Sequence, residues 1–149
     1  MLRGISPSWR PRTNEGSATT SCIMELNDRP FGYLQFYRWS DHPDAVRAMG
    51  IGPVGPGSFG LDIFVGEPDL VEKGLGTEAV EAMCSYLASD LGATEVILAT
   101  ELINHRAQRC YEKAGFVKVR QILDTDTRDG ERLVCWLMRW RPTPIIHEP

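Results

Sequence analysis

The amino-terminal half of the chain contains three runs in which apolar and polar residues alternate. Two of them cover residues 21–26 and 31–39 and flank the turn-forming residues 27–30, a pattern that predicts a β-hairpin. The third run, residues 59–65, places aliphatic side chains on one face and Asp62 on the opposite face. We therefore expect three strands before the first amphipathic helix.

The carboxyl-terminal half alternates between helical and strand-like patterns. From Val80 to Leu91, apolar residues recur every three or four positions, which predicts an amphipathic helix that ends at Gly92. The elements predicted after it are a strand at 96–99, a helix at 104–115, and strands at 116–123 and 132–140 joined through the Asp-Gly turn at 129–130. The order β-β-β-α-β-α-β-β predicts an α/β (α+β mixed) fold with a mixed sheet.

A chain of 149 residues fits one domain. Residues 1–20 lack a period and are rich in Ser, Thr, Pro, Arg and Gly, so we expect an irregular arm. Residues 40–57 contain four Gly, three Pro and two Asp, which predicts a long loop. The domain is expected to cover residues 21–140, followed by a tail at 141–149.

Charge and composition exclude several classes of protein. The formal net charge of −4 disfavours a nucleic-acid partner, and no apolar run approaches the roughly 20 residues of a membrane span. Residues 1–20 contain no apolar run that resembles a signal peptide, so we expect a cytoplasmic protein. The cysteines form neither a CxxC pair nor a zinc spacing, so we expect no metal; they are Cys22, Cys84, Cys110 and Cys135.

A glycine-rich loop precedes the first amphipathic helix. Gly74 and Gly76 allow a ligand to approach the backbone, and the free N–H groups of the helix start suit an anion such as a pyrophosphate. Lys73 adds a positive charge, although a simple glycine turn would need no ligand at all. The P-loop pattern fails because no Gly-Lys pair occurs. The dinucleotide pattern is met by Gly74, Gly76 and Ala79, but these glycines lie too far beyond the strand.

Two segments of the chain, in the same order as in the family, resemble the GNAT acetyltransferases. Residues 104–116 resemble the second signature of that superfamily, and the KGLGT loop at 73–77, with its strand and helix, resembles the acetyl-CoA site. Within the superfamily, residues 60–62, 66–70 and 109–116 look like aminoglycoside 6′-N-acetyltransferases and the related enzymes that acylate lysine-type amines in siderophore pathways.

The resemblance covers residues 21–140 and implies the GNAT acyl-CoA N-acyltransferase fold, a central mixed sheet flanked by helices. It implies transfer of acetyl from acetyl-CoA to a small cationic primary amine, with an aminoglycoside 6′-amine (antibiotic resistance) as the leading acceptor. The chain departs from the family at Val71, where many GNAT loops carry Gln or Arg. The family also begins with a strand and two helices, whereas residues 1–20 have room only for a remnant of the second helix, so we expect these N-terminal elements to be missing.

The same resemblance assigns roles to individual residues. Asp62 and Tyr111 would be catalytic, and Asp62, Gln35 and Tyr37 would bind the acceptor. The residues implied to bind the cofactor are Ile63, Phe64, Val65, Val71, Lys73, Gly74, Leu75, Gly76, Thr77, Asn104, Ala107 and Tyr111. The pantetheine arm would pair with the strand at 63–65, and a backbone N–H there would face the thioester oxygen.

Each role has a structural alternative. A carboxylate within an apolar strand costs several kcal/mol unless it is paired or hydrated, so Asp62 either has a structural partner or binds the substrate ammonium. Tyr111 either fills the core or protonates the leaving thiolate. Asn104 either caps its helix or contacts the cofactor.

At the level of the whole chain, the acceptor could instead be a siderophore-lysine-type or protein amine. The chain could also be a non-catalytic remnant that binds acyl-CoA. The sequence indicates no oligomeric state.

Overall fold

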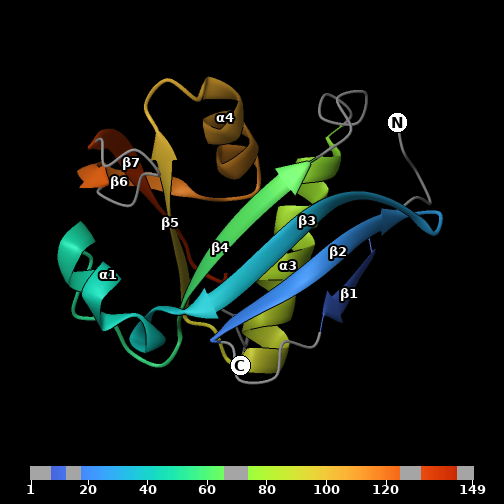
Figure 1. Cartoon of the computed structure of the whole chain (residues 1–149), viewed down its shortest axis with the longest axis horizontal. Helices are drawn as coiled ribbons and strands as arrows, with labels where there is room; N and C mark the ends of the chain where they lie inside the picture. The colour runs from blue at the N-terminus through green and yellow to red at the C-terminus, as the bar shows by residue number, and fades with distance from the viewer. Residues whose placement is uncertain (1–7, 13–17, 66–73, 125–131, 144–149) are drawn as a thin grey trace, which may run out of the picture.

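The computed structural model of the chain describes residues 8–12, 18–65, 74–124 and 132–143. Within these residues, seven strands form one mixed sheet in the order β1-β2-β3-β4-β5-β7-β6 (Figure 1). The strands are β1 (Ser8–Arg12), β2 (Thr19–Leu26), β3 (Arg29–Arg38), β4 (Ser58–Val65), β5 (Glu95–Glu101), β6 (Val117–Asp124) and β7 (Leu133–Trp140). The helices are the 3-10 helix η1 (Trp39–Asp41), α1 (Pro43–Met49), α3 (Leu75–Leu91) and α4 (His105–Lys113).

The irregular arm predicted for residues 1–20 is wrong at β1. This strand pairs antiparallel with β2, from Ser8 opposite Glu25 to Arg12 opposite Ser21. Its sequence has no alternating period and contains Pro11, which argues against a central strand. Among the described residues β1 is the edge strand, so one side of its backbone has no ladder to complete there and a proline is tolerated.

The long loop predicted for residues 40–57 is wrong in its first half, which forms the end of η1 and the whole of α1. Pro43 lies at the first helical position and Gly50 ends the helix with φ of 66°. A helix of seven residues is too short to show a 3.6-residue period, so only these two boundary residues could have revealed it.

The other predicted elements are confirmed to within about two residues, except that α3 begins at Leu75, five residues before the start of the periodic run at Val80. The first hairpin turns at Asn27 and Asp28, whose φ values of 51° and 63° are those of a type I′ turn. Gly92 ends α3 with φ of 73°, and Gly115 follows α4 with φ of 104°. The predicted turn at residues 129–130 lies outside the described residues.

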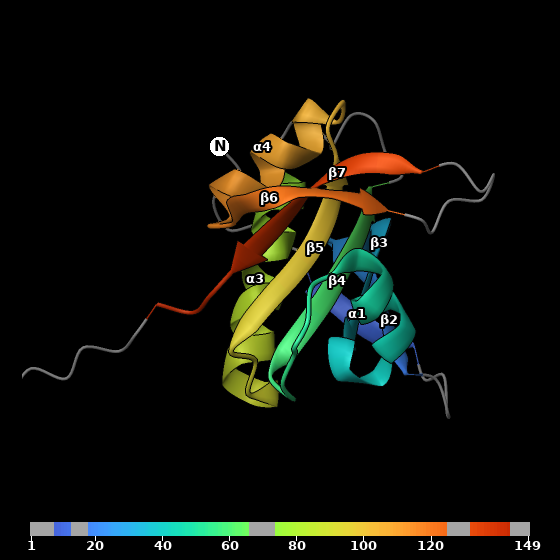
Figure 2. The ribbon, with the colours of Figure 1, turned by 90° about the vertical axis from the view of Figure 1, so that its left-hand side faces the viewer.

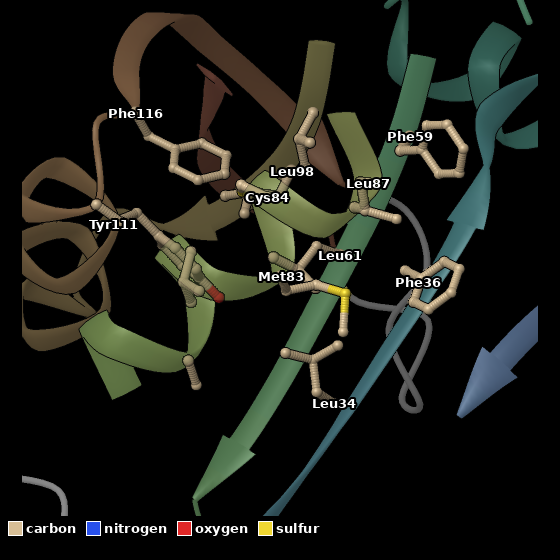
Figure 3. Packing of buried hydrophobic residues seen from close by; sticks show 14 of the residues in the cluster. Leu34, Phe36, Phe59, Leu61, Met83, Cys84, Leu87, Leu98, Tyr111 and Phe116 are labelled. Carbon is tan, nitrogen blue, oxygen red and sulfur yellow. The ribbon is translucent and has the colours of Figure 1, made fainter. Parts of the chain in front are cut away.

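Helices cover both faces of the sheet (Figures 1 and 2). On one face, α3 and α4 pack over a hydrophobic cluster in which Met83, Cys84 and Leu87 of α3 meet Leu34 and Leu61 of the sheet (Figure 3). On the other face, η1 and α1 cover a smaller cluster around Trp39, Ile97 and Leu137. Burial of each large side chain contributes about 1.5–3 kcal/mol, so α3 is held firmly. In the described part of the chain, no helix is long and apolar enough to cross a membrane.

The parallel strands β4 and β5 separate soon after they begin. Their pairing covers only Ser58 opposite Glu95 and Phe59 opposite Val96. Beyond this point β4 stays with β3, as far as Val65, while β5 continues along β7. The sheet therefore opens between the two strands (Figure 1), and this opening positions the site.

Candidate active site

A cleft of about 570 Å³ lies at the open end of the split, between β4, the start of α3, and α4. Ile63 and Phe64 of β4 form one wall. The other lining residues are Gly74, Gly76, Thr77, Asn104, Arg106, Ala107, Arg109, Cys110 and Lys113. Seven of the twelve residues predicted to bind the cofactor are therefore gathered on this one surface.

The start of α3 presents backbone donors to the cleft. Gly74 caps the helix with φ of 77°, a conformation that a residue with a side chain rarely adopts. Its carbonyl accepts the first bond of the helix, from Glu78 N at 3.1 Å. The N–H groups before Glu78 have no partner within the helix ladder, and the positive end of the helix dipole lies with them. Leu75 is fully buried, so only its backbone can take part.

The start of α4 is fixed by two side chains. The Asn104 side chain accepts a hydrogen bond from Ala107 N at 3.1 Å, which confirms that Asn104 caps the helix. Gln108, which the sequence reasoning missed, is buried and donates from Nε2 to the carbonyls of Glu101 (3.0 Å) and Leu102 (2.8 Å). Because these bonds hold the β5–α4 connection, the cleft wall is rigid on this side.

Positive side chains on α4 were also missed. Arg106, Arg109 and Lys113 line the cleft with Ala107 and Cys110. Their spacing of three and four residues puts them on one helical face, so the sequence did contain this signal. Together with the α3 terminus, they make this end of the cleft attractive to anions.

On the opposite face of the sheet lies a second hollow of about 320 Å³, which we name the acceptor pocket. It gathers the three residues predicted to bind the acceptor, Gln35, Tyr37 and Asp62. Residues that the sequence reasoning missed complete it: Thr19, Trp39, His42, Ala45, Ala48, Met49, Leu98, Ala99 and Asp124. The Tyr37 ring meets the rings of Trp39 and His42 edge to face, with centroids 5.0 and 5.1 Å apart.

Asp62 is half-buried in this pocket and has a protein partner. Gln35 lies directly opposite on β3, and its Nε2 donates to Oδ2 of Asp62 at 2.8 Å. This bond offsets part of the cost of removing a carboxylate from water. Asp62 therefore has the structural partner that one alternative required. Its position in the acceptor pocket is also compatible with the other alternative, binding of a substrate ammonium.

Tyr111 lies beneath the cleft rather than on its wall. It belongs to the main hydrophobic cluster and packs against Phe116, with ring centroids 5.5 Å apart. Figure 3 shows its hydroxyl pointing from α4 towards α3 and β4. Burial raises the pKa of this hydroxyl well above its ordinary value, and the nearby Cys110 thiol and Asp62 carboxylate raise it further. The hydroxyl is therefore protonated throughout the physiological range.

The remaining predicted cofactor residues are not all described. Val65 is described as part of β4, opposite Gly32 of β3. Val71 and Lys73 lie outside the described residues, so their assignments stay predictions.

A split mixed sheet, with a glycine-capped helix at the split and polar hollows on either side of β4, defines the GNAT fold class. The family model for the acetyltransferase (GNAT) domain matches residues 8–123. The chain belongs to this family.

Several known proteins are similar to the chain. Aminoglycoside N(6′)-acetyltransferase type 1 of Klebsiella pneumoniae is 29% identical over 133 residues, which cover 84% of this chain and 61% of that protein. The kanamycin resistance protein of Rhizobium radiobacter is 37% identical over 71 residues, 48% of this chain and 66% of that protein. Among solved structures, an aminoglycoside acetyltransferase in complex with coenzyme A and kanamycin aligns with a TM-score of 0.67 and 31% identity, over 83% of this chain and 67% of that one. The chain spans about three fifths of the length of the Klebsiella relative.

Proposed function

We propose that the protein transfers the acetyl group of acetyl-CoA to a primary amine, with an aminoglycoside 6′-amine as the leading acceptor. The observation that carries this proposal is the meeting of two hollows at β4. Asp62 faces the acceptor pocket, while the next two residues, Ile63 and Phe64, line the cleft. An amine held at Asp62 would thus lie beside a thioester held along β4. The similar proteins described above, whose names include aminoglycoside acetylation and kanamycin resistance, support this acceptor class.

The cleft fits acetyl-CoA in its chemistry. The diphosphate would bind the free N–H groups of Gly76 and Thr77 at the start of α3, and the cations of α4 would bind the remaining phosphate charge. The pantetheine arm, which is largely apolar with amide groups, would lie against Ile63 and Phe64. It would pair with the edge of β4 that β5 leaves open beyond Phe59.

Asp62 would anchor the acceptor as an ammonium ion. Direct transfer of a proton from an amine with a pKa of about 10.4 to a carboxylate of about 3.9 is uphill by roughly 9 kcal/mol. The carboxylate therefore serves mainly to bind and orient the cation. The ammonium would lose one proton to solvent before its nitrogen attacks, and Asp62 would take up the second proton from that nitrogen during or after attack on the thioester. The Tyr111 hydroxyl would stabilise the thiolate that leaves.

The proposal is tested by replacing Asp62. Asp62→Ala should abolish turnover, measured as release of free coenzyme A with kanamycin, while calorimetry shows unchanged binding of acetyl-CoA. Asp90→Ala is the matched control, because Asp90 is an exposed carboxylate near the end of α3 and lines neither hollow. Turnover that survives in Asp62→Ala would contradict the role of this residue.

The acceptor is identified with a panel of amines. Kanamycin, an N-hydroxylysine derivative and a lysine-containing peptide are compared by their kcat/KM, each with native protein. We expect kanamycin to be preferred. Saturable binding of acetyl-CoA without release of coenzyme A in the presence of any of these amines would identify a non-catalytic binding protein instead.

A further inference from the structure

Four polar side chains form a continuous row across three strands and end at Asp62. Ser21 of β2 lies opposite Gln35 of β3, which in turn lies opposite Asp62 of β4. Tyr33 lies two positions before Gln35 and therefore on the same face of β3. This is the face that carries the acceptor pocket, yet Ser21 and Tyr33 do not line that pocket.

Hydrogen bonds connect the row from end to end. The Ser21 Oγ and Tyr33 hydroxyl oxygens are 2.9 Å apart, the Tyr33 hydroxyl donates to Gln35 Oε1 at 2.7 Å, and Gln35 Nε2 donates to Asp62 Oδ2 at 2.8 Å. Because Tyr33 has a single proton and gives it to Gln35, the Ser21 hydroxyl must be the donor to Tyr33. Every donor therefore points towards the carboxylate.

Such a chain has two physical effects. Aligned hydrogen bonds polarise one another, so the bond that reaches Asp62 is stronger than one from an isolated amide. The chain also fixes the Gln35 amide, since a rotated amide would place its carbonyl oxygen against the carboxylate. Tyr33 is itself held, because its ring packs on Phe64 with centroids 6.0 Å apart and Ser21 is buried beside it.

We propose that Tyr33 and Ser21 are positioning residues for the acceptor amine, acting through Gln35 on the orientation of the Asp62 carboxylate. The inference rests on the proposed function, because it assumes that Asp62 binds the acceptor ammonium. It goes beyond that function by assigning acceptor affinity to two side chains outside the pocket. Neither Ser21 nor Tyr33 lines the cleft, and Tyr33→Phe keeps the ring that packs on Phe64 of the cleft wall, so we expect binding of the coenzyme to be unaffected.

The test is a double-mutant cycle read by calorimetry. The Kd of kanamycin is measured with coenzyme A bound, so that no reaction occurs, for native protein, Tyr33→Phe, Gln35→Ala and the double variant. Tyr33→Phe should raise this Kd by about 3- to 10-fold, which is the range of one hydrogen bond. In the Gln35→Ala background the same substitution should have no further effect, because its path to Asp62 is gone.

Three readouts separate positioning from a general structural role. The Kd of coenzyme A and the midpoint of thermal unfolding should stay at native values in Tyr33→Phe. Ser21→Ala should weaken kanamycin binding, and Ser21→Thr, which keeps the hydroxyl, should restore it. The matched control is Tyr86→Phe, because Tyr86 lies on α3 with its ring 6.2 Å from Phe36 and lines neither hollow.

The inference is overturned if Tyr33→Phe has the same effect with and without Gln35, or if Ser21→Ala and Ser21→Thr behave alike. It is also overturned if native protein binds kanamycin no better than Asp62→Ala does. A native protein that binds kanamycin through Asp62 yet releases no coenzyme A from acetyl-CoA would refute only the proposed function, since the calorimetric cycle requires no turnover.

Discussion

The role of the Tyr111 hydroxyl can be decided by Tyr111→Phe. The substitution removes one oxygen atom and keeps the ring, so the packing on Phe116 in the main cluster is preserved. The hydroxyl is buried, and its pKa lies above the ordinary value of about 10. A thiol has a pKa near 8.5, so complete transfer of the tyrosine proton to a thiolate is uphill by at least about 2 kcal/mol.

This inequality sets the size of the expected effect. A full general acid raises the rate by about 10²- to 10⁴-fold, whereas a hydrogen bond to a charged group stabilises that group by about 1.5–3 kcal/mol. We expect the second case, in which Tyr111 donates a hydrogen bond to the developing thiolate. The kcat of Tyr111→Phe should then fall by about 10- to 150-fold, and the Kd of acetyl-CoA should stay close to native.

The assay is the rate of coenzyme A release at saturating substrates between pH 6 and pH 9, with Tyr86→Phe as the matched control. The raised pKa keeps the Tyr111 hydroxyl protonated below pH 10, so the ratio of native to variant kcat should not change across this range. An unchanged kcat would show that Tyr111 only fills the core. A ratio that varies with pH between these limits would refute the assignment of a protonated donor.

Two further substitutions test the walls of the site. A Cβ at Gly60 would overlap the Tyr37 ring and lie 2.7 Å from its hydroxyl oxygen. Gly60→Ala should therefore displace Tyr37 and raise the KM for the acceptor by roughly 10-fold, the scale of a displaced contact. An unchanged KM would show that Tyr37 does not contact the acceptor. Arg109→Gln removes a cation from the cleft wall and should raise the Kd of coenzyme A by about 3- to 10-fold at low salt, with a smaller increase at high salt. Equal increases in Kd at both salt concentrations would argue against a charge contact between Arg109 and the coenzyme.

Local patterns predicted most of the fold because most helices show the 3.6-residue period of apolar positions, and most strands show the two-residue period, directly in the sequence. The helices α3 and α4 show their buried faces and their terminal glycines directly in the sequence, and β4 shows its alternation around Asp62. The errors fall where tertiary context overrides local preference. Pro11 is acceptable in β1 because, in the described part of the chain, that strand lies at the edge of the sheet, and α1 is too short to show its period.

The site was predictable to the extent that its residues share a short segment. Gly74 and Gly76 could be recognised from their place before a helix, and Asp62 from a charge within an apolar strand. Trp39, His42 and Asp124 carry no such signal, because the acceptor pocket brings them together from elements far apart in the chain. The hydrogen-bonded row behind Asp62 depends on strand register, which the sequence did not specify.

The split between β4 and β5 solves an electrostatic problem that the proposed reaction poses. A cationic acceptor requires negative side chains, whereas the diphosphate of the coenzyme requires positive groups, and in one shared hollow these charges would neutralise each other. The period of two along β4 separates them, since Leu61 and Ile63 point towards α3 and Asp62 points to the opposite face. Arg109 and Lys113 thus lie with the cleft, and Asp62 and Asp124 with the acceptor pocket. Residues of β4 line both hollows, so this strand is where amine and thioester would meet while their binding charges stay apart.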